Sequence, residues 1–168
     1  DGIWLSPWNG ATWVQSKGGD QYRRAVYTYW KRSAAYPSMM TFDGVSREVC
    51  TSRRIRTNTP LQALTTLNDS AYIDIARHFA LRMQKEGGNT IQSRIKKGYE
   101  LATMHTPGEG SVQALEKLYN AAFGQLKTDE DKTCEIMGGM NNNTNPENAA
   151  LTIVANALLN LDEVITKN

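Results

Sequence analysis

Four arginines and one asparagine lie close together in the chain and could bind an anion. They are Arg47, Arg53, Arg54, Arg56 and Asn58. A guanidinium group can donate two parallel hydrogen bonds to a carboxylate, sulfate or phosphate, and an asparagine amide can add another. The same side chains are equally suited to bonding the carbonyls and carboxylates of their own fold. The spacing therefore predicts either a loop held in place by its own side chains or a pocket for an anion.

Other groups that could do chemistry are few. The sequence has two histidines, His78 and His105, and two cysteines, Cys50 and Cys134. This scarcity excludes a Cys-x-x-Cys-His haem attachment, a zinc finger and a His-Glu-x-x-His metalloprotease helix. The arginines near Cys50 could lower the pKa of its thiol, but two separate buried thiols are the more ordinary interpretation, with a disulfide as the alternative. Both histidines are more typical of structural positions, so the chain is not expected to be an enzyme on its own.

Three tryptophans mark the first thirteen residues as a second candidate site. Trp4, Trp8 and Trp13 alternate with glycines and a proline that prevent a helix. Because one tryptophan can bury up to about 200 Å2, residues 1–20 are expected to form an extended arm that packs on a surface. That surface can belong to another domain, and a platform for stacking sugars is the alternative.

The net charge of +2 conceals an uneven distribution. Residues 17–56 carry nine basic and three acidic residues, whereas residues 57–168 carry ten basic and thirteen acidic ones. The basic segment is expected to lie against acidic helix faces or to meet an acidic ligand or partner. The small net charge and the lack of a known motif speak against nucleic acid. No stretch approaches the roughly 20 apolar residues of a membrane span.

Helical signals dominate the elements that would position these residues. A helix is expected from Asp20 to just before Pro37, followed by a loop over residues 37–58 with one turn near 46–50. Thr59, Pro60 and Gln62 form a capping-box start. Further helices are expected to begin at Asp69, Thr90, Thr128 and Asn145, with a clear apolar stripe at Val112, Leu115, Tyr119, Ala122 and Leu126.

No segment shows the alternation of a strand, so the predicted fold is all-α. We expect an orthogonal or irregular bundle of five or six helices, with a long loop-rich N-terminal segment wrapped on it. The length of 168 residues fits a single domain over 1–168. Its parts would be the arm at 1–20, a basic helix and polar loop at 21–58, and a helical body at 59–168. Because the chain begins at Asp1, we expect it to be a processed piece or one module of a larger protein.

Several strings spread over nearly the whole chain look familiar together. They are Gly2-Ile3-Trp4, Tyr22-Arg23-Arg24, Phe42-Asp43, Arg54-x-Arg56-Thr57-Asn58-Thr59-Pro60-Leu61-Gln62-Ala63-Leu64, Leu67-Asn68-Asp69 and the string from Asn156 to Glu163. With these strings the chain resembles a planctomycete family of unknown function, the PSD-type domain at the C-terminal end of large proteins that often also carry a cytochrome c module. The resemblance implies that the chain is the C-terminal module of a longer protein.

The resemblance implies an extracytoplasmic bacterial module, in the periplasm or at the cell surface, with no cofactor in this chain and haem c in a neighbouring module. The leading hypothesis is a non-catalytic interaction or structural module that binds other domains or chains of its parent protein. The alternative is the substrate-binding part of an enzyme acting on an acidic or sulfated glycan, with the arginines lining the site.

Overall fold

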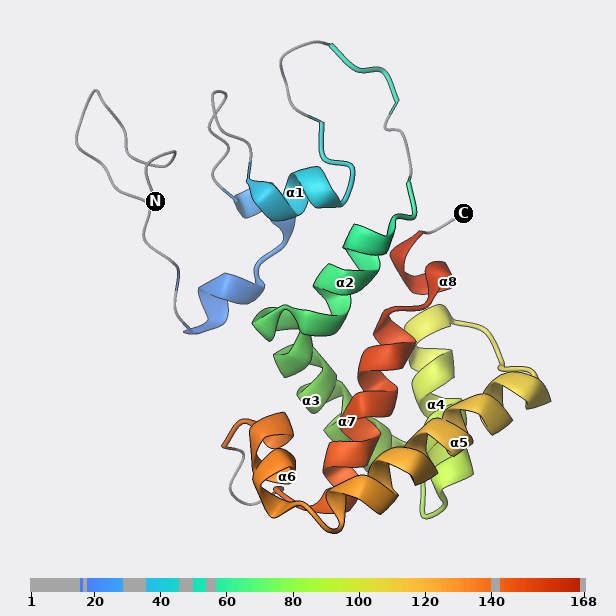
Figure 1. Ribbon diagram of the computed structural model, residues 1–168. Helices are drawn as coiled ribbons and strands as arrows, with labels where there is room; N and C mark the ends of the chain where they lie inside the picture. The colour runs from blue at the N-terminus through green and yellow to red at the C-terminus, as the bar shows by residue number, and fades with distance from the viewer. Residues whose placement is uncertain are drawn as a thin grey trace. The chain divides into compact units, whose positions relative to one another are not determined.

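Helices make up all of the regular structure in the described part of this computed structural model (Figure 1). The structure describes residue 16 and residues 18–28, 36–45, 50–53, 57–139 and 143–166. The prediction of an all-α fold is confirmed for these residues. The chain divides into two compact units, residues 1–57 and residues 58–168, which are described separately below. The expectation of one domain over 1–168 stays a prediction.

The described residues of the first unit form short helical segments. Two 3₁₀ helices, η2 (Gly18–Tyr22) and η3 (Ala25–Tyr27), lie where a longer helix from Asp20 was expected, and that expectation is wrong for these residues. Tyr22, Val26 and Tyr27 are all exposed. A helix of this length is only marginally stable without tertiary packing, and this explains why the exposed segment forms short turns in place of a longer helix. The expected helical residues Tyr29 and Trp30, and the expected turn at 46–50 apart from its last residue, lie outside the described residues.

Pro37 begins a helix, whereas the sequence analysis placed the start of a loop there. Helix α1 (Pro37–Thr41) has this proline in its first turn, after Tyr36 in an extended conformation. A proline suits that position because the first amide groups of a helix have no intrahelical acceptor and its fixed φ already matches the helix. The loop prediction is therefore wrong for residues 37–41.

The second unit is a bundle built around one helix. It consists of α2 (Pro60–Asn68), α3 (Ser70–Glu86), α4 (Ile91–Thr103), α5 (Glu109–Leu126), α6 (Glu130–Met137), α7 (Pro146–Leu159) and α8 (Asp162–Ile165). Helix α7 packs against all the other helices of this unit, most extensively against α3 and α5 (Figure 1). The six longer helices match the expected bundle, and α8 adds a single turn.

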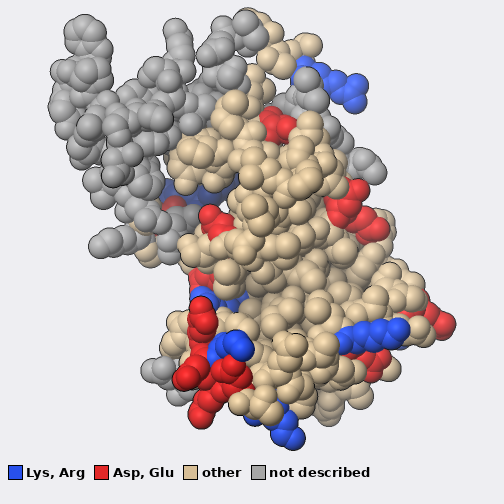
Figure 2. Space-filling view, in the orientation of Figure 1, with Lys and Arg blue, Asp and Glu red and all other residues tan. Residues whose placement is uncertain are grey.

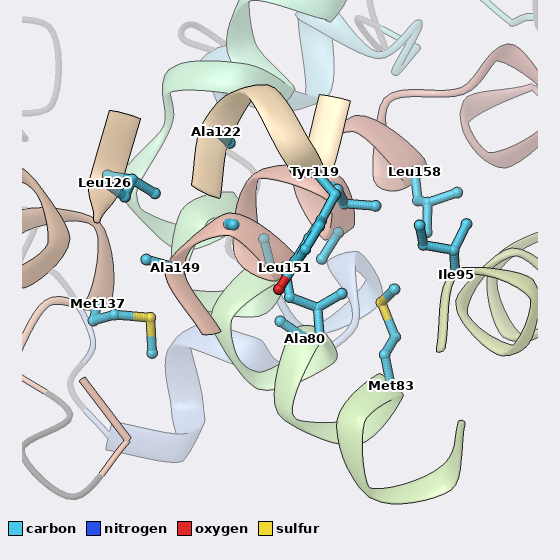
Figure 3. Packing of buried hydrophobic residues seen from close by; sticks show 14 of the residues in the cluster. Ala80, Met83, Ile95, Tyr119, Ala122, Leu126, Met137, Ala149, Leu151 and Leu158 are labelled. Carbon is cyan, nitrogen blue, oxygen red and sulfur yellow. The ribbon is translucent and has the colours of Figure 1, made fainter. Parts of the chain in front are cut away.

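The core follows the apolar stripes that the sequence predicts. Along α5, Val112, Tyr119, Ala122 and Leu126 are buried, and Leu115 packs against the same cluster. Leu151, Val154 and Leu158 of α7 are also buried, among side chains from α3, α4 and α6 (Figure 3). Helices α3 and α4 approach closely at Gly98. A Cβ at this position would lie 2.5 Å from Cε of Met83, so a larger residue there would displace this side chain. The bundle therefore has one continuous apolar centre.

In the second unit, the predicted helix starts are confirmed with one exception. The side chains of Thr59, Asp69, Thr90 and Asn145 each accept a hydrogen bond from a backbone amide in the first turn of their helix. Thr128 does not cap α6. Its hydroxyl donates to the carbonyl of Gln125, and the carboxylate of Asp129 caps the helix instead. A carboxylate is the stronger acceptor at the positive end of a helix.

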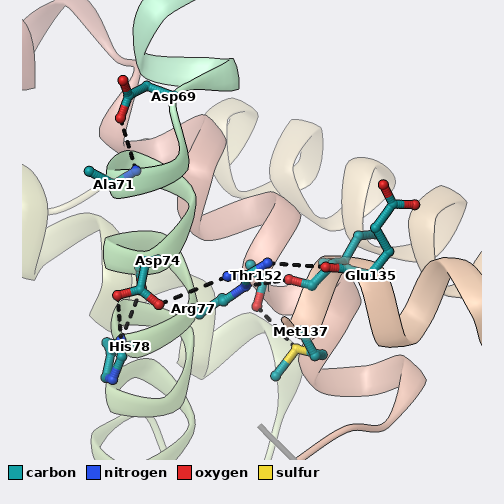
Figure 4. A network of polar contacts seen from close by, with 9 residues as sticks. Asp69, Ala71, Asp74, Arg77, His78, Glu135, Met137 and Thr152 are labelled. Carbon is teal, nitrogen blue, oxygen red and sulfur yellow. Dashed lines mark hydrogen bonds and ion pairs between the residues drawn. The ribbon is translucent and has the colours of Figure 1, made fainter. Parts of the chain in front are cut away.

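Arg77 of α3 caps the other end of α6. Its guanidinium donates to the carbonyl of Ile136 through Nε and to the carbonyl of Glu135 through Nη2, at 3.1 Å (Figure 4). Asp74 lies 3.9 Å from the same guanidinium and helps to orient it. Gly138 ends α6 with a φ of 59°, and a Cβ there would collide with the guanidinium. Arg77 therefore satisfies carbonyls that a helix end leaves without partners.

Candidate interaction site

Helix α2 is fixed at its start by a complete capping box. The amide of Gln62 donates to Oγ1 of Thr59 at 3.3 Å, and the amide of Thr59 donates to Oε1 of Gln62 at 3.0 Å. Pro60 occupies the first turn, as the sequence predicts. The side chain of Gln62 is almost completely buried. These contacts fix the direction in which the helix leaves the preceding loop.

Polar side chains hold α2 to the corner between α7 and α8. Thr66 donates to Oδ1 of Asn160, and Nδ2 of Asn156 donates to the carbonyl of Leu67 at 3.2 Å. Nδ2 of Asn58 donates to Oδ1 of Asp162 at 2.6 Å. Two of the strings that carry the family resemblance, around Asn58 and from Asn156 onward, therefore lie side by side although about a hundred residues separate them.

The orientation of α2 is the reverse of an ordinary amphipathic helix. Its inward residues are polar, since Gln62 and Thr66 are only 1% and 2% exposed. Its outward residues are Leu61, Leu64 and Leu67, which are 59%, 58% and 42% exposed. We call these three residues the leucine row. A soluble helix normally buries its leucines and exposes its polar side chains, so an outward leucine row calls for an explanation.

The surroundings of the leucine row are uncharged or acidic. Helices α2 and α7 together contain one charged residue, Glu147. Residues 57–76 and 143–166 contain no lysine or arginine. In Figure 2 the area over α2 and the adjoining part of α7 is uncharged, and charged side chains lie toward the edges of the helical body. The described residues 57–76 and 143–166 therefore contribute an apolar surface and no cation to this site.

Acidic residues lie at both ends of α2. The exposed Asp69 follows directly after the helix and caps α3, and the exposed Asp162 lies beside Asn58 just before the helix begins. Burial raises the pKa of Tyr72, and the negative charge of Asp69 raises it further. Burial likewise raises the pKa of Tyr99, and the negative charge of Glu163 raises it further. The Tyr99 hydroxyl donates a hydrogen bond of 3.2 Å to Oε2 of Glu163. Burial is the larger cause of both pKa shifts, and the negative charges of Asp69 and Glu163 add to it.

The predicted anion pocket is only partly within the described residues. Arg53 is exposed. Asn58 donates its amide to Asp162 and therefore serves the helical body. Arg47, Arg54 and Arg56 lie outside the described residues, as do the tryptophans of the predicted arm, Trp4, Trp8 and Trp13.

Asp43 closes the polar loop within the first unit. Its carboxylate accepts hydrogen bonds from the amide and from the hydroxyl of Thr57, both at 2.7 Å. Asp43 adopts a φ of 58°, a conformation that aspartate tolerates better than most residues. The loop between these two residues is thus tied at its base by contacts within the first unit.

The groups considered for catalysis are dispersed and exposed. Cys50 and Cys134 are both free and exposed, so the expectation of buried thiols is wrong and the alternative of a disulfide is not realised. Nδ1 of His78 lies 3.0 Å from the carbonyl of Asp74, one turn earlier on the surface of α3 (Figure 4). In the described ranges, no three His, Cys, Asp or Glu side chains gather as a metal would require. None of the helices that the structure describes has the length and apolarity to cross a membrane.

The leucine row was not singled out from the sequence, although two signals there point to it. Residues 60–68 contain no charged residue, and Gln62 and Thr66 are spaced to share one face of a helix opposite the leucines. A nine-residue helix without charge has one apolar face and one face with a few polar groups, and either of them can be the buried one.

One family matches this chain. Residues 4–119 match the family described as PSD1, protein of unknown function (DUF1553), and the chain belongs to that family. The matched residues include the whole of the leucine row and the capping box. No curated protein and no solved structure matches the chain.

Proposed function

We propose that this chain is a non-catalytic interaction module that docks onto another domain or chain of its parent protein through the leucine row. The parent would be a longer, extracytoplasmic protein associated with cytochrome c modules, as the family resemblance implies. The module would contribute a fixed surface to that assembly, with haem bound in a neighbouring module. The observation that carries the proposal is the outward orientation of Leu61, Leu64 and Leu67 on a helix whose polar side chains are buried.

The leucines cannot easily turn inward. The capping box and the contacts of Thr66 and Asn156 fix the rotation of α2 about its axis, with Gln62 and Thr66 toward α7. Rotating the leucines into the bundle would break these hydrogen bonds and leave buried polar groups without partners, at about 1–3 kcal/mol for each group. The row is thus a preformed surface, which reduces the entropic cost of binding.

The apolar surface is large enough to contribute to binding. Full burial of a leucine side chain contributes about 1.5–3 kcal/mol, and each member of the row has roughly half of its surface still to bury. Covering all three would then contribute about 3 kcal/mol, or roughly a hundredfold in an equilibrium constant. This is enough to position a domain that is already held nearby.

Thiol labelling at position 64 tests the proposal. Leu64→Cys is introduced into a background in which both exposed cysteines are replaced, Cys50→Ser and Cys134→Ser. The rate of maleimide labelling is compared between the purified 168-residue chain and the protein isolated at its native length under non-denaturing conditions. Gln113→Cys, at an exposed position of α5, is the matched control.

The expected result is selective protection. Labelling at position 64 should be at least about tenfold slower in the native-length protein than in the isolated chain, because the docked partner covers the leucine row. Labelling at position 113 should proceed at the same rate in both. Equal rates at position 64 would show an open face and would refute the proposal.

A further inference from the structure

We infer that the partner of the leucine row is a short amphipathic helix with a basic residue at each end of its apolar stripe. This inference deepens the proposed function and rests on it. It follows from what lies at the two ends of α2 and from the size of the surface between them. The partner is identified by this chemistry alone.

The first argument is charge complementarity along the helix. Asp162 lies at the N-terminal end of α2 and Asp69 at its C-terminal end, and both are exposed. Because α2 has nine residues, the helix between them is about 13 Å long, and the leucine row covers about 9 Å of it. Within residues 57–76 and 143–166, the described stretches that carry both carboxylates, there is no lysine or arginine. A segment with cations two to three helical turns apart would match both ends at once.

The second argument is the area available. Three half-exposed leucines present only a few hundred Å2, whereas a stable interface needs about 800 Å2 on each partner. A symmetric pair of chains joined through this row alone would therefore be weak. A helix in a domain that is already tethered nearby needs far less area, because its effective concentration is high. The surface therefore fits a helix of the same assembly better than a second copy of this chain.

The spacing of the leucine row and the backbone of α2 fit a helical partner better than an extended strand. Leu61, Leu64 and Leu67 are spaced by three residues along α2, which places them on one side of the helix. A second helix can lay side chains spaced by three or four residues between them. The backbone groups of α2 are bonded within the helix, so it offers no edge to which a strand could add.

A pair of stapled helical peptides tests the inference on the full 168-residue chain. Both peptides carry the same three-turn leucine stripe, with two lysines at each end in one and two glutamates at each end in the other. Binding is followed by NMR through the methyl signals of Leu61, Leu64 and Leu67. The lysine peptide should bind about fivefold more tightly than the glutamate peptide at low salt. This difference should shrink in 0.5 M salt.

Charge variants show whether Asp69 and Asp162 cause the preference. Asp69→Asn with Asp162→Asn removes both charges, and asparagine can still cap α3 and accept the bond from Asn58. This variant should lose the preference for the lysine peptide. The control, Glu130→Gln with Asp131→Asn, removes the same charge from the first turn of α6 and should retain the preference.

The possible results separate this inference from the proposed function. Equal binding of the two peptides, or tighter binding of the glutamate peptide, would overturn the basic partner while leaving the docking surface in place. Leucine methyl signals that respond to neither peptide at millimolar concentration would also overturn the inference. Docking itself is judged separately, by the protection of position 64 from labelling.

Discussion

Comparing a substitution on the polar face of α2 with one on its apolar face gives the sharpest test of the orientation of this helix. In an ordinary amphipathic helix, replacing a leucine is costly and replacing a glutamine is nearly neutral. Here we predict the opposite. Gln62→Ala should destabilise the chain more than Leu64→Gln, because Gln62 is 1% exposed and Leu64 is 58% exposed.

The magnitudes follow from the contacts of each side chain. Gln62→Ala removes the side-chain half of the capping box, a hydrogen bond of 3.0 Å to the amide of Thr59, at a cost of about 1 kcal/mol. It also removes buried methylene and amide groups and leaves a small cavity, at about 1 kcal/mol more. Leu64→Gln keeps most of the partly buried stem and should change the free energy of unfolding by less than about 0.5 kcal/mol.

Urea unfolding and thermal unfolding, both followed by circular dichroism at 222 nm, measure the free energies and the Tm values of the two variants. For a chain of this size, the loss of about 2 kcal/mol in Gln62→Ala corresponds to a fall in Tm of roughly 4–8 °C. Leu64→Gln should lower Tm by no more than about 2 °C. If Leu64→Gln proves as destabilising as Gln62→Ala, the leucine row is part of the core and the orientation of α2 is wrong.

Three further predictions concern the helical body. Met104 ends α4 with a φ of 64° and is 81% exposed, so Met104→Gly should raise the free energy of unfolding by about 0.5–1 kcal/mol, and a fall in the urea midpoint would contradict this. Arg77→Ala should cost about 1–2 kcal/mol because it leaves carbonyls at the end of α6 without their donor, and an unchanged Tm would show that this cap is unimportant. The hydrogen bond from Lys132 lowers the pKa of Asp129, so the stability that this carboxylate contributes is present above the ordinary pKa of an aspartate and is lost as the pH falls through its lowered value. Asp129→Asn should therefore show a smaller loss of stability between pH 7 and pH 3 than the unmodified chain, measured by urea midpoints.

The parts of the fold that were predicted correctly depend on local chemistry. Thr59 with Pro60 and Gln62, and Asn145 with Pro146, contain their whole capping mechanism within four residues. The core stripe of α5 follows directly from its spacing. Most of the helix starts and the core stripe of α5 in the helical body could therefore be predicted from the local sequence.

The errors arose where local signals compete or where packing decides. Thr128 and Asp129 are both good caps, and the carboxylate prevails because its charge favours the helix start. The apolar residues near Asp20 have helical spacing, but the described ones stay exposed and form only 3₁₀ turns. Local sequence does not reveal how much surface is available to cover them.

The candidate site was the hardest to predict, because the face that α2 buries depends on residues distant in the sequence. Thr66 is turned inward by Asn160, which lies 94 residues away in the chain. Spacing alone shows that the leucines and the polar residues occupy opposite faces, but it does not show which of the two faces is buried. The residues that the sequence favours for a site, the arginines and the tryptophans, lie mostly outside the described residues.

Site-specific photo-cross-linking tests the central claim most directly. A benzophenone amino acid is placed at position 64, and in a control at position 113, of the protein at its native length, and the cross-linked peptides are identified by mass spectrometry. We predict that position 64 cross-links to one helical segment whose apolar stripe has a lysine or arginine at each end, and that position 113 gives no such product. The absence of a cross-link at position 64, or the same products from both positions, would contradict docking through the leucine row.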